Sequence, residues 1–212
     1  SAILIGDSHA GVFAETFVQS TNSLGISAST FLWRGCPVIS KEQLAKSQEK
    51  LNSSKIQFCV DIVEQVRKIL QDKSFDFIFF SNNCEYCSFD ETIYNLKTIG
   101  NLSIYSKKVI FIGQTPVFKS KVNMGAYPFK KFFEYQQVEK SNVLEKIKLQ
   151  INLEISQSSI NNISYLDSYA IICPIACTMK DNGKYTFIDN NHLSKSGAEL
   201  FRHSITDFLQ NN

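Results

Sequence analysis

Short apolar runs alternate with amphipathic segments along this chain, and this alternation constrains the fold more than any other feature. A continuous apolar run is typical of a strand covered on both faces, whereas apolar residues three and four positions apart are typical of a helix. The strands expected on this basis are 2–5, 26–33, 75–80, 108–113 and 163–167. Helices are expected at 9–25, 54–71, 89–99, 144–155 and 196–209, the last opened by a capping box from Ser196 to Glu199.

Strands that alternate with helices form a parallel sheet with helices on both faces. We therefore predict an α/β protein: a three-layer α/β/α sandwich around a parallel five-stranded sheet. The chain has 212 residues, of which 43% are hydrophobic, and this is enough for one folded domain spanning residues 1–212. Because the first apolar run begins at residue 2, we interpret the chain as a domain excised from a longer, membrane-anchored protein.

Charge and hydropathy argue against two classes of function. The net charge is only +2 and no long run of one sign occurs, whereas a nucleic-acid-binding protein usually carries a dense basic surface. No apolar stretch approaches the roughly 18 residues that cross a bilayer.

Polar residues follow four of the expected strands. Ser8 follows the first strand, Gly35 the second, Asn82 and Asn83 the third, and Thr115 the fourth. The carboxyl ends of parallel strands meet at one edge of the sheet, where sites of open α/β proteins gather. We expect the functional site at this edge.

Ser8 is the candidate nucleophile, and a serine hydroxyl needs an adjacent base. His9 is its neighbour, but successive side chains point in different directions, so His9 is badly placed to serve it. His203 lies within the last expected helix and is interpreted as a surface or packing residue. His192 lies in a loop before that helix, with Asp189 three residues earlier, which is the spacing of a base with its orienting acid.

Gly-Asp-Ser and Asp-Asn-Asn-His are each common turn or loop sequences when they occur alone. Only their occurrence together in one chain is specific. "GDSH" at 6–9 and "DNNHLS" at 189–194 resemble the SGNH/GDSL hydrolase superfamily, which has a flavodoxin-like α/β/α fold. The resemblance implies that Ser8 is the nucleophile, His192 the base and Asp189 its orienting acid. The superfamily's oxyanion hole maps onto the Ser8 N–H, Gly35 and Asn83, with Asn82 as a substitute.

The chain departs from the superfamily pattern after the third strand, where Ser81 replaces a glycine and Cys84 an aspartate. It is most similar to the SGNH domains fused behind acyltransferase-3 membrane proteins, which transfer acyl groups, usually acetyl, to bacterial surface glycans such as lipopolysaccharide O-antigen. The stretches that carry this similarity are "GDSHA", "GCP" at 35–37, "CPIAC" at 173–177 and "DNNHLSKSGA".

The six cysteines are Cys36, Cys59, Cys84, Cys87, Cys173 and Cys177. Their even number favours disulfides and an oxidising compartment, with free thiols or a zinc site as alternatives. The resemblance implies the disulfides Cys36–Cys59 and Cys173–Cys177. Cys84 and Cys87 then pair with each other or stay reduced.

Aromatic and basic residues are candidates for a substrate rim. Arg34 follows Trp33 and has two interpretations. It either contacts a sugar or a carboxylate at the rim of the site, or it is a surface charge beside a tryptophan packed in the core. Tyr127 and Phe129 lie in an aromatic, basic segment that is either a stacking wall for a glycan or a packed connection with solvated lysines.

The resemblance implies a periplasmic O-acetyltransferase domain, tethered to the inner membrane by an upstream transmembrane acyltransferase domain that supplies the acetyl donor. It implies a glycan acceptor, no metal and no cofactor. The charge argues against a nucleic-acid partner, and we expect a monomer for the isolated domain. The alternatives are a carbohydrate or lipid esterase with water as acceptor, a non-catalytic glycan-binding module and, more remotely, a zinc-stabilised structural domain.

Overall fold

The computed structural model describes residues 1–34, 53–82, 103–116, 162–174, 180–189 and 191–211. A parallel five-stranded sheet has the order β2-β1-β3-β4-β5. Its strands are β1 (Ala2–Gly6), β2 (Ala28–Leu32), β3 (Phe75–Ser81), β4 (Ser106–Ile112) and β5 (Ile163–Leu166). The expected α/β architecture and all five expected strands are confirmed.

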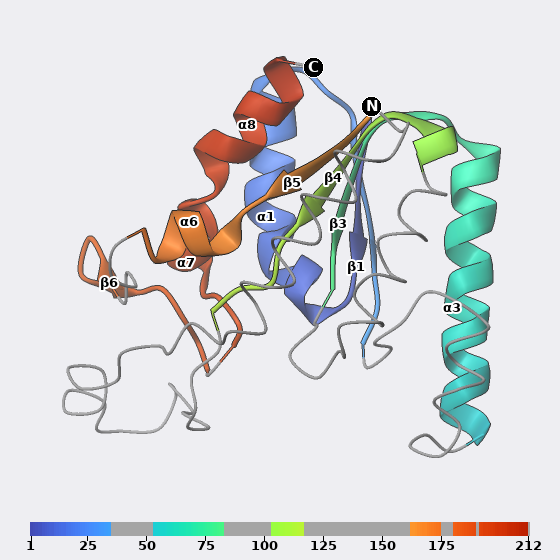
Figure 1. Ribbon diagram of the computed structural model, residues 1–212, viewed down its shortest axis with the longest axis horizontal. Coiled ribbons are helices and arrows are strands. Elements are labelled where there is room, and N and C mark those ends of the chain that lie inside the picture. Colours follow the sequence, from blue (N-terminus) through green and yellow to red (C-terminus); the bar gives the residue numbers. More distant parts are fainter. Residues whose placement is uncertain (35–52, 83–102, 117–161, 175–179, 190, 212) are drawn as a thin grey trace.

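Helices cover both faces of this sheet. They are α1 (Ser8–Ser23), α3 (Ser53–Asp72), α6 (Ser168–Ile172), α7 (Lys195–Glu199) and α8 (Arg202–Gln210), with a short 3₁₀ helix η1 (Ser103–Tyr105) and a small antiparallel pair β6 (Lys180–Asp181) and β7 (Lys184–Tyr185). Figure 1 shows α3 on one side of the sheet and α1, α7 and α8 on the other. Within the described ranges, no helix combines the length and the apolarity that a membrane span requires.

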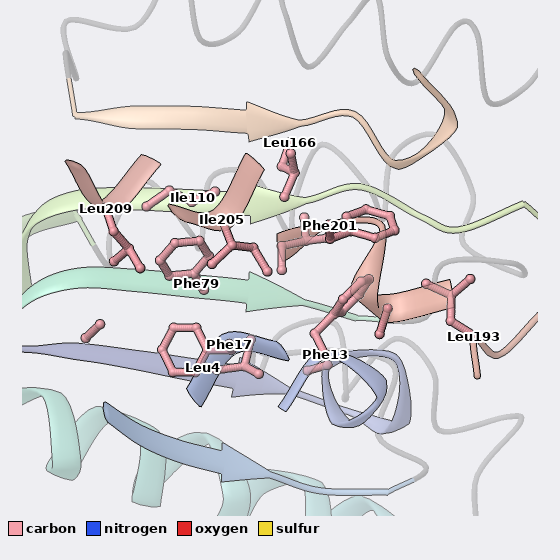
Figure 2. Packing of buried hydrophobic residues seen from close by; sticks show 14 of the residues in the cluster. Leu4, Phe13, Phe17, Phe79, Ile110, Leu166, Leu193, Phe201, Ile205 and Leu209 are labelled. Carbon is pink, nitrogen blue, oxygen red and sulfur yellow. The ribbon is translucent and has the colours of Figure 1, made fainter. Parts of the chain in front are cut away.

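Each strand sends alternate side chains into two separate cores, because the side-chain period of a strand is two. Ile3, Ile5 and Phe80 pack beneath α3, whose buried face includes Cys59 and Val66. The opposite core, drawn in Figure 2, is filled by α1, α8 and the other strand face. Its labelled members are Leu4, Phe13, Phe17, Phe79, Ile110, Leu166, Leu193, Phe201, Ile205 and Leu209.

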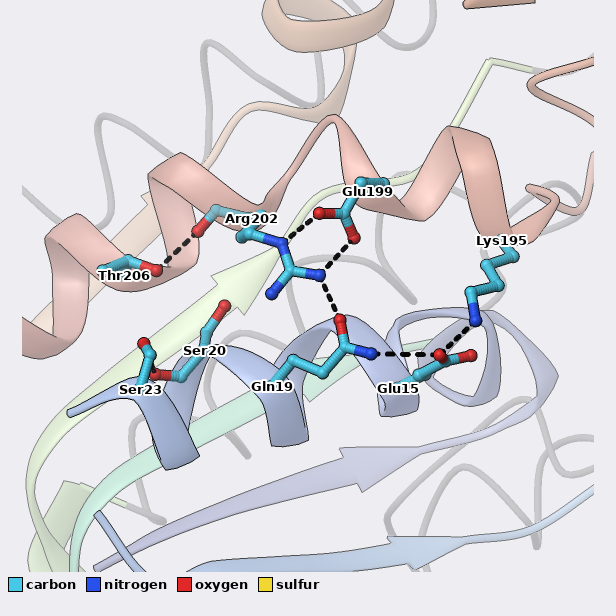
Figure 3. Close-up of polar contacts among 8 residues, drawn as sticks. All are labelled: Glu15, Gln19, Ser20, Ser23, Lys195, Glu199, Arg202 and Thr206. Atoms are coloured by element: carbon cyan, nitrogen blue, oxygen red, sulfur yellow. Dashed lines mark hydrogen bonds and ion pairs between the residues drawn. The ribbon is translucent and has the colours of Figure 1, made fainter. Parts of the chain in front are cut away.

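Polar contacts join α1 to the C-terminal helices along their exposed edge (Figure 3). Lys195 forms an ion pair with Glu15, and Arg202 donates to Gln19 and forms an ion pair with Glu199. Exposed ion pairs of this kind contribute little free energy each. The helix that begins at Ser8 is held against the C-terminal helices mainly by buried packing, including that of Phe13 on Phe201.

The C-terminal segment differs from the sequence prediction in two ways. The cap is Ser194, not Ser196: the Ser194 backbone is extended and its Oγ accepts from the Gly197 N–H at 3.2 Å. The expected single helix is also broken. The N–H groups of Leu200 and Phe201 donate to carbonyls three residues back, and this tight turn ends α7 before α8 begins.

Several expectations fall outside the described residues. These are the helices at 89–99 and 144–155, and four of the six cysteines. Cys59 and Cys173 are both buried, on opposite faces of the sheet, so they are not paired with each other. The pairings Cys36–Cys59 and Cys173–Cys177 stay predictions.

Gly6 ends β1 in a conformation that requires glycine. Its φ is +152°, and a Cβ built on it would lie 1.7 Å from the Ser81 carbonyl oxygen and 2.6 Å from the Ala10 Cβ. Backbone strain and overpacking should together make Gly6→Ala less stable by about 3 kcal/mol or more. Denaturant unfolding measures this difference.

Gly11 supplies the matched control, because a Cβ there would have no atom within 4 Å. Gly11→Ala lies inside α1 and should gain roughly 0.5–1 kcal/mol from helix propensity. Equal stability of the two variants would contradict the close approach at Gly6.

Candidate active site

Ser8 is the first residue of α1, and only Asp7 separates it from the end of β1. Asp7 caps the helix: its Oδ1 accepts from the His9 N–H at 2.9 Å and its carbonyl accepts from the Gly11 N–H at 3.0 Å. This capping fixes the point at which the chain turns from strand into helix. Ser8 is therefore held at the carboxyl edge of the sheet, where the sequence places it.

His192 lies directly beside Ser8, although 184 positions separate them in the chain. The Ser8 Oγ and the His192 Nε2 are 2.9 Å apart, and the His192 Nδ1 is 2.7 Å from the Asp189 Oδ2. An ionised carboxylate only accepts hydrogen bonds, so the ring proton belongs on Nδ1. Nε2 is then free to accept the proton of the Ser8 hydroxyl.

The loop that carries Asp189 and His192 is closed on itself. Phe187 and Leu193 form an antiparallel bridge, and the Ile188 N–H donates to the His192 carbonyl at 3.0 Å. Thr115, which follows β4, donates its hydroxyl proton to the Asn191 carbonyl at 2.8 Å. The loop is thus fastened to the sheet edge, and Thr115 has a structural contact there.

Asp189 is held in its ionised form. Its partial burial acts to raise the pKa, but hydrogen bonds from the backbone N–H groups of Asn191 and His192 and from the His192 ring outweigh burial, so the pKa lies below its usual value. The two backbone bonds to Oδ1 are 2.9 and 2.7 Å long. Asp189 is therefore a fixed anion that orients the imidazole.

A cleft of about 920 Å³ opens beside Ser8 and His192. Leu32, Phe58 and Ile188 line it with exposed apolar side chains. Arg34 is exposed and also lines it, and its predicted contact to a sugar at the rim stays a prediction. Trp33 also lines the cleft, and it is buried in the core that packs beneath α3.

The remaining predicted site residues lie partly inside and partly outside the described ranges. Asn82 is only 4% exposed and is not among the described residues that line the cleft. Gly35, Asn83, Tyr127 and Phe129 lie outside the described residues. The predicted oxyanion hole and aromatic wall stay predictions.

His9 is the site residue that sequence reasoning missed. Its ring lies against that of His192, with the ring centroids 4.6 Å apart. The sequence indicates only that His9 is badly placed to serve its neighbour Ser8, whereas the residue that it contacts, His192, is distant in sequence. His203, in contrast, is exposed at α8, as expected, and pairs with Asp207 at 3.3 Å.

Residues 1–207 match the family model described as "SGNH domain (fused to AT3 domains)". A search of curated protein sequences finds no match.

A comparison with solved structures finds matches at low sequence identity, of which the first below shows the same fold. The periplasmic domain of a lipopolysaccharide acetyltransferase from Salmonella ser. Paratyphi A is 18% identical with a TM-score of 0.62, and the alignment covers 98% of this chain and 83% of that one. A possible lipase from Chitinophaga pinensis is 12% identical (TM-score 0.48; 99% and 97% covered). An acetylxylan esterase from Geobacillus stearothermophilus is 10% identical (TM-score 0.44; 99% and 93% covered).

Proposed function

This chain belongs to the family of SGNH domains that are fused to AT3 domains, and from that membership we propose that it O-acetylates a bacterial surface glycan through an acetyl-Ser8 intermediate. The observation that carries the proposal is the hydrogen-bonded series Ser8–His192–Asp189 at 2.9 and 2.7 Å. A serine, a base and a fixed orienting carboxylate at these distances are the groups that nucleophilic acyl transfer requires. Family membership supports acyl transfer or ester hydrolysis as the class of reaction.

In the first half of the reaction, Ser8 Oγ attacks the carbonyl carbon of an acetyl donor while its proton passes to His192 Nε2. The donor's leaving group departs with that proton, and the acetyl group remains on Ser8. Asp189 accepts from Nδ1 throughout and stabilises the imidazolium. The Ser8 N–H, Gly35, and Asn83 or Asn82 are the proposed donors to the carbonyl oxygen.

In the second half, His192 accepts the proton of a glycan hydroxyl, whose oxygen attacks the acetyl carbon. The bond to Ser8 Oγ breaks and Ser8 recovers its proton from His192. The reaction needs no metal or cofactor in this account. The donor is supplied by an upstream membrane domain, and the glycan is reached at the periplasmic face of the inner membrane. The Salmonella domain of similar fold, which is a periplasmic domain, supports this location.

Hydrolysis is the second candidate because the two polar side chains behind Ser8 are open to water. The side chains of His192 and Asp189 are 25% and 36% exposed. Water that reaches His192 can replace the glycan hydroxyl, and the domain then acts as an esterase.

The acceptor is tested by supplying p-nitrophenyl acetate with and without lipopolysaccharide O-antigen oligosaccharide, and by measuring free acetate and acetylated sugar by mass spectrometry. We expect sugar that gains acetyl groups at the expense of free acetate. Free acetate alone, unchanged by the sugar, would assign the domain as an esterase. Binding of the sugar with neither product, and with no acetylated protein, would favour a glycan-binding module.

A further inference from the structure

His9 is buried directly behind the candidate base. It is the second residue of α1, and its side chain is only 2% exposed. Its ring lies 4.6 Å from that of His192, centroid to centroid, with the planes inclined by 37°. The candidate base therefore has a second imidazole packed against it.

The burial of this imidazole is not explained by hydrogen bonding. Among the described residues, neither ring nitrogen of His9 has a partner at hydrogen-bond geometry. The nearest carboxylate oxygen, Asp7 Oδ1, is 3.7 Å from Nδ1, and the Asn191 backbone offers only a weak hydrogen-bonding interaction that acts to raise the pKa of His9. A buried polar group without a partner costs free energy that an apolar ring of similar size would avoid, so packing alone does not account for a histidine here.

We propose that His9 is a positioning residue for His192: its ring supports the face of the His192 imidazole in the plane that joins Ser8 to Asp189, and stabilises that imidazole when it carries a proton. This inference rests on the proposed function, in which His192 becomes positively charged when it takes the Ser8 proton. A neutral aromatic ring at this distance attracts such a cation, whereas a second cation would repel it.

His9 is suited to this role because it stays neutral. Burial lowers its pKa, the charge of His192 lowers it further, and Asp189 and the Asn191 backbone oppose these effects, with a result of about 4. The titratable groups that face it among the described residues are Asp7, Asp189 and His192. Above about pH 5, His9 is therefore an uncharged ring, and it remains so while His192 gains and loses its proton.

The test compares His9→Ala with His9→Phe, which keeps an aromatic ring in the same place. In the alanine variant we expect kcat for p-nitrophenyl acetate hydrolysis to fall about 10- to 100-fold with little change in KM, because the base is no longer held in position. The midpoint of the His192 titration, followed by NMR of its ring nitrogens, should move down by about half a pH unit. The phenylalanine variant should keep kcat within about threefold and should keep the wild-type midpoint.

Phe17→Leu is the matched control, since Phe17 is a buried core residue of α1 and is not among the described residues that line the cleft. It should lose stability without a change in kcat or in the His192 titration.

Three results would overturn the proposal: a folded His9→Ala protein with wild-type kcat and midpoint, a phenylalanine variant as impaired as alanine, or wild-type His9 that titrates together with His192. The NMR titration needs no turnover. If the wild type lacks Ser8-dependent activity, the proposed function fails, and the titration still decides the role of His9. If His9→Ala does not fold, the wild-type and His9→Phe titrations decide it.

Discussion

Ser8→Ala is expected to lower the turnover of p-nitrophenyl acetate by about 10,000-fold or more. The alanine variant has no hydroxyl to attack the carbonyl, and water would have to react without a covalent intermediate. In the described part of the chain, the Ser8 hydroxyl has one hydrogen bond, to the His192 Nε2, so the substitution should leave the fold intact. Steady-state kinetics, with circular dichroism as the check on folding, measures this result.

Ser168→Ala is the matched control for this substitution. Ser168 also begins a helix after the carboxyl end of a strand, and its buried hydroxyl donates to the Gly113 carbonyl at 2.6 Å. The Ser168 variant should lose stability through that hydrogen bond and keep its kcat. A loss of activity at Ser168 as large as that at Ser8 would argue that serine removal acts through folding.

Asp189→Asn is expected to lower kcat by about 10,000-fold while the protein stays folded. The asparagine amide can donate to the His192 Nδ1, and the imidazole then carries its proton on Nε2, facing Ser8. In that tautomer His192 cannot accept the serine proton. Asp167→Asn is the control, because Asp167 caps α6 through a hydrogen bond from the Ala170 N–H at 3.1 Å, and asparagine caps equally well.

The carboxylate of Asp189 also makes the stability of the folded protein depend on pH. The pKa of Asp189 is lowered in the folded protein, so its ionised form stabilises the native state at pH values above the unfolded pKa, about 3.8. This contribution is lost as the pH falls through the lower folded value. The stability difference between wild type and Asp189→Asn should therefore shrink as the pH is lowered from 6 toward about 2, and a difference that grows would contradict the assignment.

The sheet, and the two segments that carry Ser8 and the pair Asp189 and His192, could be predicted because each is indicated by residues that are neighbours in the sequence. β3 and β4 are covered by helices on both faces, so each appears in the sequence as an uninterrupted apolar run. Asp189 and His192 lie in one short loop, and Ser8 lies at the end of β1. The rule that parallel strands end at one edge places Ser8. The loop of Asp189 and His192 follows no strand of the five-stranded sheet, and its position beside Ser8 is expected from the resemblance to the SGNH/GDSL superfamily.

The features that the sequence did not predict depend on contacts between distant segments or on backbone detail. His9 contacts a ring far along the chain, and nothing in its neighbours indicates this. The division between α7 and α8 depends on the tight turn at Leu200 and Phe201, whereas the apolar spacing continues across it. The sequence predicts the wrong cap because Ser196 and Glu199 match the capping-box pattern. In the structure the helix begins two residues earlier, and its cap is Ser194.

The central claim is that Ser8 carries the acetyl group, and trapping that species tests it most directly. The wild-type protein is mixed with p-nitrophenyl acetate, quenched in acid within the first turnover, digested and examined by mass spectrometry. The account predicts one added acetyl group on the peptide that contains Ser8, absent from Ser8→Ala and released when glycan or water is given time to react. Turnover with the acetyl group found on another residue, or with no acetylated peptide in the burst phase, would contradict it.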